Sequence, residues 1–378
     1  MFLTPSGRGG DLRAAAMALR DFGCDDFFIL DRRGGGVFLP DGTPVAAEAG
    51  IAVETHLVFL NADTALEDAR FFARRGIVAK RAIGAWAWEL EWLPRRWRHA
   101  FSFYDEIWAA SDFSRAAFAR ENLRPVRLVP PVVSLPTKRT QPSRTALGIP
   151  EGETVFFFMF DFLSHVRRKN PEAVIEAFCS AFPSGEEKVR LLIKTQGATQ
   201  APADWRRLAD LALDPRIELR DAALDRAEVI ALIEATDAFV SLHRAEGFGR
   251  GPAEAMWLGK PVILTGYSGT NDFADRESAF IIDYRKIPIS DWEYPGVEGQ
   301  EWADPDILAA ARAMRGIHRR PRAAHAIAAC GKKRIEARYS PAVAAAAMCE
   351  ALGFAPRASR MKPAKPIVWL MNVTADRE

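Results

Sequence analysis

Long apolar runs are missing from this chain. No stretch approaches the roughly 20 apolar residues that a membrane-spanning helix needs, and residues 1–13 contain no apolar core of signal-peptide length. Both absences predict a cytoplasmic protein, which could still touch the cytoplasmic face of a membrane.

Cysteine is also scarce, with four residues in a chain of 378. These residues, at positions 24, 179, 330 and 349, are far apart and show no metal-ligand spacing, so we expect free thiols in a reducing compartment. The sequence also lacks a convincing acidic metal motif. Its run of Asp304, Pro305 and Asp306 is typical of a helix start instead. The sequence therefore predicts no metal site.

The chain also lacks an excess of charge of either sign. Lys and Arg number 51 against 49 Asp and Glu, and the net charge of +2 is too mild to predict nucleic-acid binding. The remaining composition, 49 % hydrophobic and 26 % charged, is ordinary for a soluble globular protein. A length of 378 residues suggests two domains.

A strand–loop–helix–strand unit stands at the centre of the second half of the chain. The apolar run 237–242 predicts a buried strand, and a Gly-rich loop follows it. Gly251 and Pro252 predict the start of a helix that ends at Gly259, before a second strand at 262–265. This order is typical of a parallel sheet, whose ligands lie at the carboxyl ends of the strands.

Two glutamates flank the loop of this unit. Glu246 lies on the loop and Glu254 lies in the predicted first helical turn, an E-x₇-E spacing. The glycines Gly247, Gly249 and Gly251 let backbone approach a ligand, and the helix start suits a phosphate. Carboxylates accept hydrogen bonds from sugar or ribose hydroxyls. Taken singly, Glu254 could merely favour the helix N-terminus and Glu246 could be a solvated loop residue, but the joint pattern is far more specific.

The pattern resembles the signature of retaining glycosyltransferases of family 4, nucleotide-sugar enzymes with the GT-B fold. The resemblance covers most of residues 50–350 and is strongest from Thr154 to Phe273. It implies an α/β protein with two Rossmann-like, doubly wound domains facing each other across a cleft. We expect an acceptor-binding domain at 1–140 and a nucleotide-sugar-binding domain at 152–352.

The resemblance also implies an activity and roles for residues. A hexose would move from a UDP- or GDP-hexose to a hydroxyl of a glycan or lipid-linked acceptor, with retention of configuration and without a metal or another cofactor. Glu254 would bond the ribose hydroxyls, while Glu246 and Lys169 would serve as the catalytic pair. The rest of the donor site would comprise Arg168, Lys194, Gly247, Phe248, Gly249, Arg250 and Gly251.

The sequence does not settle the roles of three positions in the donor site. Leu163 stands where the family usually carries an arginine, about six residues before its lysine, so the arginine that binds the diphosphate is not fixed. Arg250 replaces a small or apolar residue, and it could reach the diphosphate or be a salt-bridged surface residue. Lys194 could be a third cation or a strand-end charge.

Candidate acceptor residues occur in the first half of the chain. Asn61 and Asp63 directly follow a predicted strand, where they could bind a ligand or simply form a turn. Trp86, Trp88 and Glu89 resemble the aromatic-rich strand end of the family, where rings stack on sugars and a carboxylate binds hydroxyls. Core tryptophans with a surface acid are the alternative.

Basic residues gather around these tryptophans. The segment 70–98 holds eight of them against two acids, a local balance of 8 − 2 = +6. We expect this segment near an anionic membrane, with an acceptor that is lipid-linked or part of a surface polysaccharide or lipopolysaccharide. A solvated helix face beside core tryptophans is equally compatible with the pattern.

Two other functions compete with transfer. A catalytically inactive GT-B-like module could bind a nucleotide or glycan, although the intact Glu246, Glu254 and Lys169 argue against it. An NAD(P)-dependent oxidoreductase would need a G-x-G-x-x-G motif, but the glycines at 7–10 lack its third glycine, at position 12.

The last expectation concerns the two ends of the chain. Residues 5–10 read as a Gly-rich turn that feeds a helix with Asp11 as a possible cap, so the first strand of the domain is short or absent. The apolar run Ile367 to Val373 has strand length and follows a basic linker. We predict that this tail returns to the N-terminal domain and supplies the missing strand, in its own chain or in a neighbour. A disordered tail, or the opening strand of a further domain, is the alternative.

Overall fold

The computed structural model of the protein describes residues 7–24, 27–31, 37–39, 43–45, 52–136, 142–290, 292–294, 297, 299–354 and 368–372. The chain forms two compact units. The first unit comprises residues 1–134 and 337–378, and the second comprises residues 135–336.

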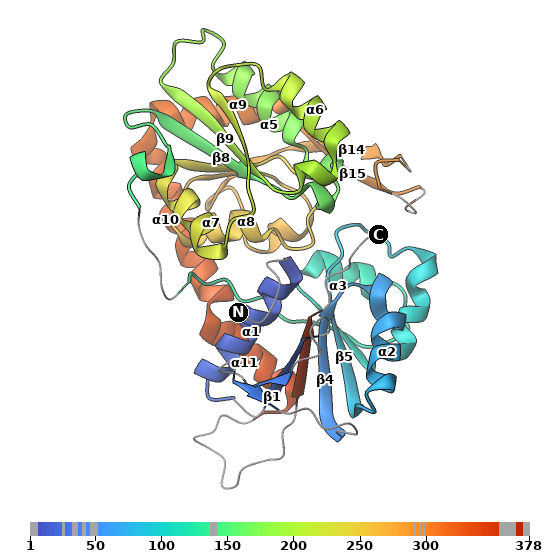
Figure 1. Cartoon of the computed structure of the whole chain (residues 1–378). Coiled ribbons are helices and arrows are strands. Elements are labelled where there is room, and N and C mark those ends of the chain that lie inside the picture. Colours follow the sequence, from blue (N-terminus) through green and yellow to red (C-terminus); the bar gives the residue numbers. More distant parts are fainter. Residues whose placement is uncertain are drawn as a thin grey trace. The chain divides into compact units, whose positions relative to one another are not determined.

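The first unit is built on an eight-stranded sheet in the order β3-β2-β1-β16-β4-β5-β6-β7 (Figure 1). The strands from β1 to β7 in this order pair in parallel, and β2 and β3 add antiparallel pairs at one edge. The strands are β1 (Phe27–Asp31), β2 (Val37–Phe38), β3 (Pro44–Val45), β4 (Ala52–Leu60), β5 (Val78–Trp86), β6 (Glu106–Ala109), β7 (Val126–Leu128) and β16 (Val368–Asn372). The helices are α1 (Gly7–Asp21), α2 (Ala65–Arg74), α3 (Asp112–Ala119), α11 (Pro341–Leu352) and the 3₁₀ segments η1 (Ala62–Thr64) and η2 (Arg95–Phe103).

Helix α1 packs against α11 over the core of the first unit. Its apolar residues at helical spacing are buried, among them Leu12, Ala15 and Leu19. The sequence placed a Gly-rich turn before this helix, with Asp11 as its cap, and this was wrong. The helix already begins at Gly7, so these glycines lie within it. Tertiary packing of the apolar face offsets their poor helix propensity.

The tail strand β16 lies inside this sheet. It pairs in parallel with β1 on one side and with β4 on the other, so that Leu370 lies opposite both Ile29 and Leu57. Figure 1 shows it as the red strand among the blue ones. This is the strand that the sequence predicted at 367–373, and the structure forms it within the same chain. Without it, β1 and β4 would face each other with unpaired backbone groups, which is costly.

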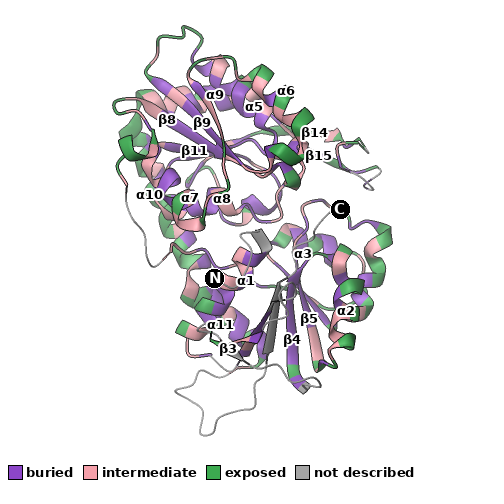
Figure 2. Cartoon of the chain, viewed as in Figure 1, coloured by how far each residue is buried: buried purple, intermediate pink, exposed green. Residues whose placement is uncertain are grey.

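The second unit is a doubly wound sheet of six parallel strands in the order β10-β9-β8-β11-β12-β13. Its strands are β8 (Thr154–Met159), β9 (Val189–Thr195), β10 (Ile217–Asp221), β11 (Ala238–Ser241), β12 (Val262–Thr265) and β13 (Phe280–Ile282). Its helices are α4 (Val166–Lys169), α5 (Pro171–Ala181), α6 (Pro202–Leu211), α7 (Arg226–Ala235), α8 (Arg250–Trp257), α9 (Ile307–Arg319) and α10 (Pro321–Tyr339). An antiparallel arm of β14 (Tyr284–Pro288) and β15 (Glu301–Pro305) stands apart from the sheet. The central strands are buried, as the purple of Figure 2 shows.

Two helix starts differ from the sequence prediction. Helix α8 begins at Arg250, two residues before Pro252, because Gly249 adopts a left-handed φ of 91° and turns the chain into the helix there. Helix α9 begins at Ile307, since Asp306 accepts a hydrogen bond from Ala309 N (2.9 Å) and is its cap. Asp304 instead lies in β15, so the predicted helix start at 304–305 was wrong.

The division into units also differs from the predicted boundaries. The sequence assigned residues up to 352 to the second domain, whereas α11 groups with the first unit. The reason is its buried face, where Ala344, Ala345 and Met348 share one apolar cluster with α1. The other boundary, after Ser134, falls at the beginning of the Pro- and Ser-rich stretch that predicted the linker.

Candidate active site

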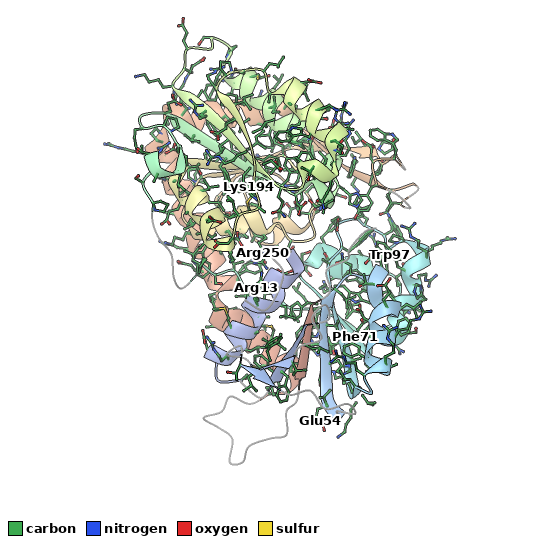
Figure 3. All side chains as sticks on the ribbon, in the orientation of Figure 1. Arg13, Glu54, Phe71, Trp97, Lys194 and Arg250 are labelled. Atoms are coloured by element: carbon green, nitrogen blue, oxygen red, sulfur yellow. The ribbon has the colours of Figure 1, made fainter. Side chains whose placement is uncertain are left out.

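The carboxyl edge of the second sheet gathers the donor-site residues predicted from the sequence. Helix α4, after β8, carries Arg168 and Lys169, and the loop between β11 and α8 carries Glu246. Figure 3 labels Lys194 on β9 and Arg250 on α8. All these residues belong to the second unit.

Glu246 is bound by two cations. Lys169 Nζ lies 2.5 Å from its Oε1, and Arg168 Nη1 lies 3.2 Å from its Oε2. The three side chains are only 13 %, 19 % and 7 % exposed for Glu246, Lys169 and Arg168. The sequence named these residues, and the structure brings them into one buried cluster with a formal charge of +1.

The carboxylate of Glu246 stays ionised in this cluster. Burial raises its pKa, but Lys169 and Arg168 outweigh that effect and hold the pKa at about 2. Nearby His243 is fully buried, and burial lowers its pKa to about 4. At neutral pH the cluster therefore contains an anionic glutamate and a neutral histidine.

Helix α4 has unusual backbone on both sides. His165 before it and Asn170 after it adopt positive φ values of 60° and 57°, which non-glycine residues rarely do. The Asn170 side chain donates to Leu242 O (2.9 Å), and the His165 ring stacks on Tyr294 at 4.1 Å. Arg168 also donates to Ala245 O at 2.9 Å. These contacts fix a costly conformation, a feature that clusters at functional sites.

The glycines of the loop between β11 and α8 allow close packing, besides the approach of a ligand that the sequence predicted. A Cβ on Gly249 would lie 2.6 Å from Thr270 Cγ2, and one on Gly251 would lie 2.9 Å from Phe239 Cζ. Gly249 can therefore lie against Thr270, and helix α8 can approach Phe239 of β11, only because both positions lack a side chain. Phe248 is 9 % exposed and packs on Phe273, while Gly247 lies beside Gly269.

Glu254 is buried under two arginines. It is 2 % exposed, and its Oε1 lies 2.5 Å from Arg226 Nη1 and 3.7 Å from Arg250 Nη1. Arg250 is thus salt-bridged, one of the two roles that its sequence position left open. Arg226 begins α7, and no sequence signal marked it, because it is 28 residues away on another helix.

Lys194 and Leu163 are the other two positions whose roles the sequence left open. Lys194 is 5 % exposed at the end of β9, 3.5 Å from Gln196 Oε1, and burial lowers its pKa against the raising effect of Asp161 and Asp221. Leu163 is 54 % exposed. Arg168 is the arginine that lies beside Glu246 and Lys169 instead.

The acceptor residues predicted in the first unit divide into two groups. Asn61 and Asp63 are exposed around η1, at the carboxyl end of β4, and Glu89 is half-buried. Trp86 and Trp88 are 1 % and 3 % exposed. Trp86 packs edge-on against Phe101, Tyr104 and Phe118, and Trp88 packs against Trp97. Both rings are core residues in this structure.

The sequence missed a small cavity at the same edge of the first sheet. It measures about 50 Å³ and is lined by Asp11, Phe59, Trp86, Trp108 and Met348, among others. Its walls come from α1, α11 and the ends of three strands, a combination that only the fold creates.

Two kinds of feature are missing from the described residues. Among these residues, none of the helices is long and apolar enough to cross a membrane. Across the same part of the chain, no group of three or more His, Cys, Asp or Glu side chains is placed to hold a metal ion.

Residues 154–288 match the family described as Glycosyl transferases group 1. No curated protein matches the chain. Among solved structures, Anabaena HepE in complex with UDP and glucose shares 18 % identity at a TM-score of 0.59, over 78 % of this chain and 77 % of that one.

Two further structures show the same similarity. Sucrose-phosphate synthase from Thermosynechococcus elongatus is 16 % identical over 78 % of this chain and 72 % of that one, with a TM-score of 0.60. The apo structure of OtsA is 12 % identical over 82 % and 74 %, with a TM-score of 0.58. The protein therefore has the GT-B fold of two Rossmann-like domains, and its residues 154–288 are similar to the glycosyl transferases group 1 family.

Proposed function

We propose that the protein transfers a hexose from a nucleotide sugar to a hydroxyl of a glycan or lipid-linked acceptor, with retention of configuration. The observation that carries this proposal is the buried cluster of Glu246, Lys169 and Arg168, together with the buried Glu254 on the following helix, within a segment that matches glycosyl transferases group 1. A UDP-hexose is the favoured donor, because the similar structure of HepE contains UDP and glucose.

The proposed roles follow from charge and position. Glu246 accepts hydrogen bonds from the donor hexose, and Lys169 and Arg168 receive the charge that develops on the departing diphosphate. The N-terminus of α8, which follows the loop of Glu246, adds the positive end of a helix dipole. Fixed cations stabilise such charge without reorganisation, so we propose a front-face transfer that needs no metal.

Donor-dependent release of nucleoside diphosphate tests this function. The purified protein is incubated with UDP-, GDP-, ADP- and dTDP-hexoses and a candidate acceptor glycan, with and without EDTA. We expect release from one donor, dependent on the acceptor and unchanged by EDTA. An inactive binding module would bind a nucleotide without releasing product, and strong inhibition by EDTA that is reversed by magnesium would contradict the metal-free route.

Arg226 offers a test of the nucleotide subsite. In the structure it holds Oε1 of Glu254, so we infer that it orients this carboxylate toward the ribose. Arg226→Met removes a charge-assisted bond worth about 1.5–3 kcal/mol, and we expect nucleotide affinity to fall at least tenfold. Arg226→Lys should recover part of the affinity.

Arg206→Met is the matched control, because Arg206 is exposed on α6 of the same unit and donates only to Pro202 O in the contacts described. Equal nucleotide affinity in the wild type and in a folded Arg226→Met variant would contradict the inference. Tighter binding in the variant would show that Arg226 blocks Glu254 rather than orienting it.

A basic and aromatic surface of the first unit supports a lipid-linked acceptor. Much of the basic segment is neutralised, since Lys80 pairs with Glu54 and Arg81 with Glu106. In the 3₁₀ segment η2, Arg98 pairs with Glu121. Its Arg95 and Arg96 are exposed. Next to it, Trp92 is 53 % exposed, with the Arg120 guanidinium 4.5 Å from its ring centroid. We call these four residues, together with Leu123, the Trp92 patch.

The composition of the Trp92 patch suits a membrane surface. Leu123 is 43 % exposed and adds apolar area. Cations beside an exposed indole match the anionic headgroups and the interface of a bilayer. We therefore propose that this face touches the membrane that holds the acceptor.

Vesicle co-sedimentation at low salt tests this contact. The wild type should bind vesicles with anionic lipid, and Arg95→Glu/Arg96→Glu should lose most binding, since each cation near the surface contributes about 1 kcal/mol. Arg319→Glu/Arg322→Glu changes the net charge equally at exposed sites of the second unit. Equal loss in this control, or no binding by the wild type, would favour a merely solvated face.

A further inference from the structure

Two cysteines that are 325 residues apart in the sequence meet inside the first unit. Cys24 lies in the turn after α1, and Cys349 lies in the last turns of α11. Their Sγ atoms are 2.6 Å apart, and the residues are 1 % and 3 % exposed. Both are thiols in this structure. The distance lies between the roughly 2.05 Å of an S–S bond and the separation of two unbonded sulfur atoms in contact.

The surrounding structure fixes both positions. Cys24 N donates to Leu19 O (2.8 Å), and Phe354 N donates to Cys349 O (2.8 Å). Both side chains belong to the apolar cluster that joins α1 to α11, together with Ala345 and Met348. Moving the sulfur atoms apart would therefore disturb this packing, whereas closing the bond needs a shift of only a few tenths of an ångström.

From this placement we propose that Cys24 and Cys349 form a reversible disulfide that joins the turn after α1 to α11. Two thiols lose two protons and two electrons as the S–S bond forms. A small-molecule disulfide such as oxidised glutathione accepts them: one cysteine thiolate attacks it and releases one thiol, and the second cysteine then displaces the other thiol from the mixed disulfide. The balance is one disulfide consumed and one formed.

Burial controls when this reaction can occur. Burial, followed by the hydrogen bond and the charge of Cys24, raises the pKa of Cys349 well above its usual range. In the folded protein Cys349 is therefore almost entirely a thiol, whereas the thiolate is the reactive species. The bond should close while the first unit folds or opens locally, and once closed it should resist reductants outside the core.

The bond would stabilise the first unit. It closes a loop of about the 325 residues between the cysteines, and long loops gain the most in the chain-entropy account. It would fasten α11, which comes from the far end of the chain, covalently to the N-terminal helix.

Peptide mapping of the wild-type protein tests the proposal without any substitution. The protein is unfolded and refolded in a glutathione redox buffer, alkylated under denaturing conditions and digested. We expect one crosslinked peptide pair containing Cys24 and Cys349, alkylation of Cys179 and Cys330 only, and an intact mass about 2 Da below that of the dithiol. Four alkylated cysteines, or any other pairing, would overturn the proposal.

Melting experiments give a second readout. The oxidised protein should unfold roughly 5 °C or more above the same protein after reduction in denaturant and refolding. Cys179→Ala/Cys330→Ala should keep this difference, while Cys24→Ala should lose both the difference and the crosslinked peptide. An oxidant-dependent shift that survives in Cys24→Ala would contradict the assignment. If Cys24→Ala fails to fold, the wild-type peptide map still decides.

Discussion

Glu246→Gln is expected to lower hexose transfer by at least about a hundredfold while leaving nucleotide affinity unchanged or slightly improved. The first effect follows because one preorganised charged group at a reacting centre contributes about 10²–10³ in rate. The second follows from the charge of the cluster, which rises from +1 to +2 when the carboxylate between Lys169 and Arg168 becomes an amide. A diphosphate would then no longer compete with the carboxylate of Glu246 for the two cations.

Paired measurements of turnover and of nucleotide Kd check this result. Glu293→Gln is the control, because Glu293 is a half-buried carboxylate of the same unit that lies 3.9 Å from Arg244 and outside the cluster. Near-wild-type turnover of Glu246→Gln would reject its role at the reacting centre. A joint loss of turnover and nucleotide binding would indicate a collapsed site instead.

Removal of strand β16 should have the largest effect on stability. Deletion of residues 358–378 would leave β1 and β4 without the five-residue partner that both pair with. The lost ladders and the exposed apolar edges should cost as much as the roughly 5–15 kcal/mol by which a domain is stable, and an unpaired inner edge promotes aggregation. We expect insoluble protein or a first unit that does not fold.

A point substitution refines this experiment. Leu370→Pro removes one backbone N–H from the middle of β16 and should act like the deletion, whereas Leu370→Val keeps the strand. Solubility and melting temperature report the outcome. Soluble, fully active protein with an unchanged melting temperature, after deletion or after Leu370→Pro, would refute a structural role of the tail.

The strands and the main site residues could be predicted because their signals are local. Apolar runs of strand length mark β4, β8 and β11, and the spacing of Glu246 and Glu254 singles out the loop between β11 and α8. The tail strand was also predictable, because the run at 367–373 is apolar, has strand length and contains β-branched residues.

The remaining features depend on contacts that no local pattern encodes. Arg226 reaches Glu254 from another helix, and Cys24 meets Cys349 across almost the whole chain. Trp86 follows Gly84, over which its indole folds: a Cβ on Gly84 would lie 2.4 Å from Trp86 Nε1. That packing buries the ring. An aromatic strand end looks the same in the sequence whether its rings face a ligand or the core.

Calorimetric titration of UDP, GDP, ADP and dTDP tests the central claim most directly, namely that the second unit binds the nucleotide of a sugar donor through Glu254. We expect one of the four to bind the wild type, and binding to Glu254→Ala to be about 10- to 150-fold weaker, the equivalent of a charge-assisted hydrogen bond worth about 1.5–3 kcal/mol. Glu151→Ala, an exposed position of the same unit, should bind like the wild type. No binding of any nucleotide to the wild type, or equal affinity in a folded Glu254→Ala variant, would contradict the claim.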